Sequence, residues 1–79
     1  MGRRAEDAAF LRAFGKALRD ARKRRGVSQE ELGYEADLDR TYVSGLERGV
    51  RNPTVVTIRR LARALQTKAS RLMAAAEEQ

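Results

Sequence analysis

Residues 28–49 constrain the fold more than any other part of the sequence, because two helix starts and their stops lie within this short segment. Ser28, followed three residues later by Glu31, forms a capping box, in which each side chain bonds the backbone N–H of the other residue. Asp39 is a second N-cap candidate, and Gly49 stops the helix that it begins. We therefore expect two helices of about two turns each, separated by about three residues.

This arrangement is what a helix-turn-helix needs, and three further features agree with it. Gly33 lies on the inner side of the first helix, where two steeply crossing helices must nearly touch; a chance glycine would cost about 1 kcal/mol relative to alanine. Asp37 lies in the turn, which usually requires a left-handed residue and tolerates Asp after glycine. The apolar residues that must close over the preceding helix are Leu32, Ala36, Leu38, Val43 and Leu46.

Helical periodicity predicts three more helices and no strand. The first runs from about Asp7 to Arg25, another opens at Pro53 and Thr54, and Thr67 caps the last. We therefore expect an all-α fold of five helices, a single domain over residues 1–79 with residues 1–5 and 77–79 frayed. The inner faces are assigned to Phe10, Phe14, Leu18 and Ala21, to Ile58, Leu61, Ala62 and Leu65, and to Ala69, Leu72, Met73 and Ala76.

The sequence contains no cysteine and no histidine, which excludes disulfides, thiolate or imidazole metal sites and histidine-based catalysis. No serine, threonine or tyrosine has a nearby base, and the glycines form no phosphate loop. We expect no enzyme, no metal, no cofactor and no small-molecule ligand. No apolar run reaches the roughly 18 residues of a membrane span, and no signal-peptide pattern is visible, so we expect a cytoplasmic protein without a membrane partner.

The formal net charge is +6, and the charges fall in blocks. Residues 1–25 hold nine Lys/Arg and three acids, residues 28–47 hold one base and six acids, and residues 48–71 hold seven bases and no acid. Two interpretations stay open at this point. The blocks are either a solvated helical surface or two basic edges that hold phosphate around a central reading element.

The stretch VSQEELGYEADLDRTYVSGLERGVRNPT, residues 27–54, resembles the helix-turn-helix of the Cro/C1-type repressor family, whose members have a phage-repressor-like five-helix domain. The resemblance runs from about Phe14 to Leu72, and LDRTYVSGLERGVRN is especially similar to the controller proteins of restriction–modification systems. Two positions depart from the family pattern. Asp37 stands where glycine is common, and Gly45 stands where a base-reading side chain is frequent. With Gly45, the helix could lie closer to DNA or to the helix before it, and more sequence would be read through DNA shape.

The resemblance implies that the second helix of the motif enters the major groove of double-stranded DNA by its N-terminal half. Arg40 has a planar fork that suits guanine, although it could also be a solvated helix start, and Tyr42 could simply pack on the preceding helix. The expected base-reading residues are Arg40, Thr41, Tyr42 and Ser44. The expected phosphate contacts are Gln29, Arg48, Arg51 and Asn52, together with Lys16. Lys16 and Arg12, one turn apart on the first helix, are weaker candidates that could simply be solvated.

The resemblance also implies a structural ion pair between Arg22 and Glu47, and a homodimer on a palindromic operator. The expected dimer interface is Val55, Val56, Ala69, Leu72, Met73 and Ala76, unless these residues only complete the monomer core. The acids near the DNA-binding edge, Glu30, Glu31, Glu35 and Asp37, either disfavour wrong contacts or meet RNA polymerase. The expected function is a repressor or activator of transcription, with an antitoxin-like or adaptor protein as the alternative.

Overall fold

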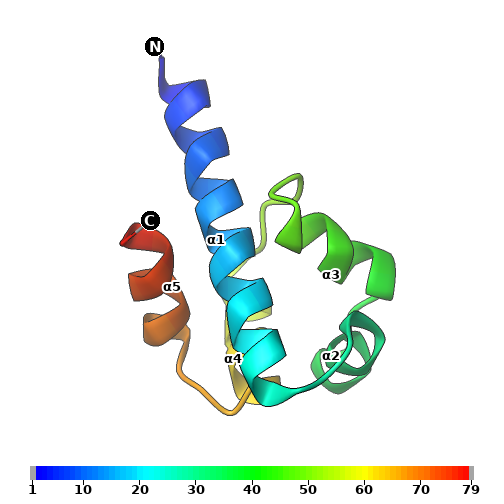
Figure 1. The fold of residues 1–79 in the computed structure, drawn as a ribbon. Coiled ribbons are helices and arrows are strands. Elements are labelled where there is room, and N and C mark those ends of the chain that lie inside the picture. Colours follow the sequence, from blue (N-terminus) through cyan, green and yellow to red (C-terminus); the bar gives the residue numbers. More distant parts are fainter. Residues whose placement is uncertain (1, 79) are drawn as a thin grey trace.

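Five helices follow one another without an intervening strand in residues 2–78, which are the residues that the computed structural model describes (Figure 1). They are α1 (Arg3–Arg25), α2 (Gln29–Ala36), α3 (Arg40–Glu47), α4 (Val55–Ala64) and α5 (Ala69–Glu77). Helix α1 runs between α3 on one side and α5 on the other, while α4 packs against α2 and α5. The predicted all-α fold with five helices is confirmed.

Helix α1 begins at Arg3, earlier than the predicted start near Asp7. No helix breaker follows Gly2, and Arg4, Ala5 and Glu6 are good helix formers, so the helix extends back to Arg3. It ends where predicted, at Gly26, whose φ of 78° is left-handed and whose N–H donates to the carbonyls of the last turn. Met1 and Gln79 lie outside the described residues, and the fraying of the two ends stays a prediction.

The signals at α2 and α3 act as the sequence predicts. Ser28 and Glu31 form the reciprocal capping box, and Asp39 caps α3 by accepting from the backbone N–H of Thr41. Asp37 is left-handed at φ 60°. Gly33 permits a close approach, because a Cβ at that position would lie 2.6 Å from the carbonyl oxygen of Leu38, whose own N–H donates to Gly33. The tight turn that joins the two helices therefore depends on Gly33 and Asp37 together.

At the far end of the chain, one predicted cap is confirmed and one is wrong. Thr54 caps α4 by accepting from the N–H of Thr57. Thr67 does not cap α5, because the N-cap position belongs to Lys68, whose side chain makes no capping bond. The reason is that the N–H of Thr67 is used to close α4, at 2.9 Å from the carbonyl of Ala62, after Gln66 turns left-handed at φ 58°. The N-cap of α5 therefore lies one residue later than predicted, at Lys68.

The core forms where the five helices meet, and the predicted inner faces supply most of it. Phe10 is the exception, because it is 37% exposed and so lies largely outside the core. The N-terminal turns of α1 project beyond the other helices (Figure 1), and Phe10 lines a pocket with Ala76 and Glu77 of α5 instead of joining the core. The fully buried large side chains are Leu18, Leu32, Val43, Leu46 and Leu61.

Over residues 2–78 no helix combines the length and the apolar character needed to cross a membrane.

Candidate nucleic-acid interface

Helix α3 turns one side to the core and the other side outward. Val43 and Leu46 are buried, and Arg40 and Thr41 at the start of the helix are exposed. Because an α-helix has 3.6 residues per turn, Thr41, Ser44, Gly45 and Arg48 share the outward face. Of the four predicted base-reading residues, three therefore lie at the N-terminus or on this face. The fourth, Tyr42, is half-buried against the core, as the alternative interpretation of that residue allowed.

The start of α3 is held in place by its own cap. The carboxylate of Asp39 accepts from the backbone N–H of Thr41 at 2.9 Å and from its hydroxyl at 2.8 Å. These two hydrogen bonds, together with the nearby charge of Arg40, lower the pKa of Asp39 below its ordinary value. The hydroxyl of Thr41 is thus used as a donor, while its oxygen lone pairs and its methyl group stay available to a base edge.

The side chain of Arg51 lies beside Gly45 and over the ring of Tyr42. Its guanidinium carbon lies 5.8 Å from the centre of the Tyr42 ring, which is within cation–π range. A Cβ added at Gly45 would lie 2.7 Å from Cγ of Arg51. Gly45 therefore makes room for Arg51 rather than for a closer α2, which corrects that part of the expectation.

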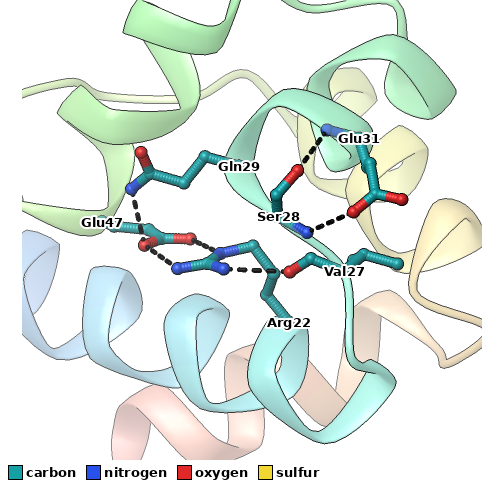
Figure 2. A network of polar contacts seen from close by, with 6 residues as sticks. All are labelled: Arg22, Val27, Ser28, Gln29, Glu31 and Glu47. Carbon is teal, nitrogen blue, oxygen red and sulfur yellow. Dashed lines mark hydrogen bonds and ion pairs between the residues drawn. The ribbon is translucent and has the colours of Figure 1, made fainter.

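The end of α3 is fixed to α1 by the predicted ion pair (Figure 2). Arg22 Nε lies 2.6 Å from Glu47 Oε2 and Arg22 Nη2 lies 3.0 Å from Glu47 Oε1, so the pair is bidentate. The remaining nitrogen of Arg22 donates to the carbonyl of Val27 at 3.0 Å. The two side chains are only 12% and 4% exposed. Hydrogen bonding to Glu47 raises the pKa of Arg22, against the opposing effect of burial, so the guanidinium stays charged.

Gln29 joins this network. Its side-chain nitrogen donates to Glu47 Oε1 at 3.0 Å, as Figure 2 shows. The structure therefore ties the first residue of α2 to the last residue of α3, at the side of α1. An amide nitrogen has two hydrogens, and this bond uses one of them. The predicted phosphate contact at Gln29 remains chemically possible with the other hydrogen.

The other predicted phosphate contacts differ in how free they are. Arg48 and Asn52 are exposed in the segment between α3 and α4, although Arg48 Nε lies 3.4 Å from the hydroxyl of Ser44. Lys16 lies on α1, where it pairs with Asp20 at 3.1 Å, so part of its charge is already balanced. Arg12 packs against the backbone at Gly49. The segment that contains Arg48, Arg51 and Asn52 is thus the most concentrated group of these cations and amides.

Sequence reasoning missed the close approach of α1 to the end of α3, which depends on two glycines. A Cβ at Gly15 would collide with the carbonyl oxygens of Leu46 and Glu47. A Cβ at Gly49, which is left-handed at φ 78°, would lie 2.7 Å from Cα of Arg12. Gly15 could have been noticed, because a lone glycine in an otherwise regular helical pattern often marks a close approach.

The six residues predicted at the dimer interface separate into two groups. Val55 and Val56, in the first turn of α4, are 83% and 58% exposed. Leu72 and Ala76 are only 3% and 2% exposed, because α5 folds them into the monomer core. Ala69 and Met73 are half-buried against the same core. The assignment of Leu72 and Ala76 to a partner is therefore corrected, and the rest of that interface stays a prediction.

Two short helices joined by a tight turn, with the second helix exposed along one face and locked at its end, define a helix-turn-helix domain of the DNA-binding kind. The family model described as Helix-turn-helix matches residues 18–72. This chain belongs to that family.

Within the family, the chain is similar to control proteins of restriction–modification systems. It is 43% identical over 53 residues to control protein C.BamHI of Bacillus amyloliquefaciens, which covers 66% of this chain and 65% of that protein. The crystal structure of the controller protein C.AhdI from Aeromonas hydrophila is 47% identical, covers 78% of this chain and 94% of that chain, and has a TM-score of 0.77. The tetramer of controller protein C.Esp1396I, in complex with its natural 35 base-pair operator, is 29% identical over 87% of this chain and 91% of that chain, with a TM-score of 0.78. The expected family and the narrower resemblance are both confirmed.

Proposed function

We propose that this protein is a sequence-specific transcription regulator, the controller protein of a restriction–modification system, which binds a palindromic operator as a homodimer. The observation that carries the proposal is the exposure of Arg40 and Thr41 at the start of α3. That start is capped by Asp39, and the end of the helix is joined to α1 by the ion pair between Arg22 and Glu47. A rigid, outward-facing helix of this length suits the major groove of B-form DNA. The names of the relatives support regulation rather than an enzyme or an adaptor.

In this proposal Arg40, Thr41 and Ser44 read base edges. Arg40 is exposed at the first position of α3, where its fork can take guanine O6 and N7. The phosphates of the two strands are held on either side of the groove. Gln29 would use its second amide hydrogen at the start of α2. Arg48, Arg51 and Asn52 would contact the DNA backbone after α3. Lys16 lies on α1, before the helix-turn-helix in the sequence. DNA would have to displace its hydrogen bond to Asp20.

The dimer follows from the small amount of DNA that one domain can read. Two recognition helices on a palindrome sit one helical turn of DNA apart, about 34–36 Å. Val55 and Val56 are the exposed apolar residues on α4 that a second copy could cover. The solved C.Esp1396I tetramer on its operator supports such an assembly for a related protein. We further propose that the protein acts in the cytoplasm, where it would meet RNA polymerase.

Selection of bound duplexes from a random pool, with the protein-to-DNA ratio measured, tests this function. We expect a palindromic site bound by two or four copies. Arg40→Ala should lower affinity for that site and relax the preference at one base pair per half-site, by about 5- to 150-fold. A pool without enriched sequences, or an Arg40→Ala variant with unchanged discrimination, would contradict the proposal.

A further inference from the structure

We propose that a cleft at the end of α1 binds a multiply charged, phosphate-bearing ligand, with Arg25 as its central group. The cleft lies where the end of α1 meets the turn between α4 and α5 (Figure 1). It is separate from the candidate nucleic-acid interface, and the inference does not depend on the proposed function. The five cationic side chains that line this arginine cleft are Arg24, Arg25, Arg60, Arg63 and Arg71.

The arginine cleft consists of two neighbouring hollows. One, of about 460 Å³, lies between the ends of α1 and α2 and the second half of α4, and the other, of about 340 Å³, lies between α1 and α5. Arg25 and Gln66 line both hollows, so the two meet at these side chains. Volumes of this size suit a small ligand. Among the described residues none of α3 lines either hollow, so a bound ligand would leave the recognition helix free.

The hydrogen bonding of Arg25 is incomplete. Its Nε atom is buried and has no hydrogen-bond partner within residues 2–78. Its Nη2 atom lies 3.6 Å from Oε1 of Glu35, which is too far for a hydrogen bond. A guanidinium carries five N–H donors, and a donor removed from water without an acceptor costs free energy. Because the side chain is only 29% exposed, an anion in the cleft would supply acceptors that the protein does not.

Four more arginines surround this group. Arg24 precedes it on α1, Arg60 and Arg63 come from α4, and Arg71 comes from α5. All four are exposed, and within residues 2–78 none of them forms an ion pair. Cations from three helices that line one cleft repel one another, and a multivalent anion would relieve that repulsion.

The balance of charge in the cleft indicates the class of ligand. Its carboxylates are Glu35 and Asp37, both in the hollow beside α2, so five arginines less two acids leave a formal charge of +3. A single carboxylate would balance only part of this charge. The planar fork of arginine matches two oxygens of a phosphate group, which favours a ligand with several phosphate oxygens. Free polyphosphates and nucleotides have this chemistry, and so does the backbone of a nucleic acid.

Titration calorimetry with inorganic tripolyphosphate, at about 0.15 M ionic strength, tests the site. We expect one saturable site per chain. Arg25→Gln should weaken binding by about 10- to 150-fold, and Arg25→Lys should lose much of the affinity although it keeps the charge, because it lacks the fork. Arg4→Gln is the matched control, since it removes an exposed arginine at the other end of α1 and should leave the affinity unchanged.

Glu35→Gln supplies a change of the opposite sign. It removes the carboxylate that competes for Arg25, so tripolyphosphate binding should strengthen by up to about fivefold. Thermal unfolding with and without tripolyphosphate gives a second measurement, because a ligand of the folded state raises the midpoint. If Arg25 were only structural, Arg25→Gln would lower the midpoint without ligand but keep the increase that the ligand causes.

Duplexes of random sequence identify the source of the phosphate groups. If Arg25→Gln weakens tripolyphosphate binding and lowers duplex affinity no more than Arg4→Gln does, the ligand is a free phosphate compound. If Arg25→Gln weakens a long duplex more than a short one, the phosphates belong to nucleic acid that passes the arginine cleft. Equal effects of Arg25→Gln and Arg4→Gln on tripolyphosphate and on both duplexes would overturn the inference, whereas selection of an operator sequence tests the proposed function separately.

Discussion

At the scale of single residues, the most consequential contact is the pair between Arg22 and Glu47. It joins α1 to the last residue of α3, and further hydrogen bonds tie Arg22 to the carbonyl of Val27 and Glu47 to the side chain of Gln29. Such a pair costs desolvation when it forms, so its value depends on complete satisfaction. Each of the three guanidinium nitrogens of Arg22 donates one hydrogen bond, which offsets part of the cost of placing two charges where little water reaches them.

Glu47→Ala should destabilise the fold by about 3–5 kcal/mol, because it leaves the guanidinium of Arg22 without its partner in a site that is largely closed to water. Chemical denaturation monitored by circular dichroism measures this change. Lys16→Ala provides the matched control, since its pair with Asp20 is 63% and 45% exposed and should contribute at most about 1 kcal/mol. Equal losses in the two variants would show that the Glu47 pair is no better than a surface pair.

Two capping carboxylates should make stability depend on acid. Hydrogen bonds from Ser28 lower the pKa of Glu31 below its ordinary 4.5, and hydrogen bonds from Thr41 lower the pKa of Asp39 below its ordinary 3.8. Because the unfolded chain takes up these protons first, the contribution is complete above the ordinary values and is lost as the pH falls through the folded ones.

The thermal midpoint should therefore drop between about pH 5 and about pH 3. A variant with both Glu31→Gln and Asp39→Asn should be less stable near neutrality and should lose less on acidification. Thermal unfolding across this range makes the comparison. An acid response as steep in the double variant as in the wild type would exclude these two caps as its source.

At the scale of elements, local signals decided which boundaries could be predicted. Ser28, Asp39 and Thr54 bond backbone groups within three residues, so the sequence contains everything that they need. The start of α5 could not be predicted in the same way. Gln66 turns left-handed although it is neither glycine nor asparagine, because the chain must reverse there to lay α5 against α1.

In the candidate site too, the residues fixed by local motifs could be predicted, and those placed by the path of the chain could not. Arg40, Thr41 and the pair of Arg22 with Glu47 follow from motif spacing and family resemblance. The position of Arg51 does not, because it depends on the path of the segment after α3 and on the space above Gly45. Periodicity likewise indicates that Leu72 and Ala76 share an apolar face, but not whether the covering surface belongs to the same molecule.

The turn between α2 and α3 offers a test at this scale. Gly33→Ala should destabilise the fold, although alanine is usually favoured over glycine in a helix, because its Cβ would lie 2.6 Å from the backbone oxygen of Leu38. Alanine normally stabilises a helix interior by about 1 kcal/mol over glycine, so a loss of stability reverses the expected sign. Chemical denaturation of the wild type and of Gly33→Ala gives the sign of the change. A stabilised Gly33→Ala variant would mean that the turn can relax at little cost.

At the scale of the whole molecule, assembly depends on a surface that the monomer leaves uncovered. Two adjacent valines, Val55 and Val56, open α4 directly after the segment that carries Arg51 and Asn52. A partner that covers these valines would therefore also fix the position of that segment. Contact between copies and contact with DNA would thus be coupled through about five residues of chain.

Val55→Glu tests this coupling, because dimerisation would bury a carboxylate without a partner while the folded monomer would leave it in water. We expect sedimentation equilibrium to show a shift from dimer to monomer, circular dichroism to show an unchanged fold, and operator affinity to fall at least tenfold. Tyr34→Ser is the control, since Tyr34 is 89% exposed on α2 and is not part of the predicted interface, so its loss should leave the dimer intact. A wild type that stays monomeric on its operator, or a Val55→Glu variant that dimerises as before, would place the contact between copies elsewhere on the surface.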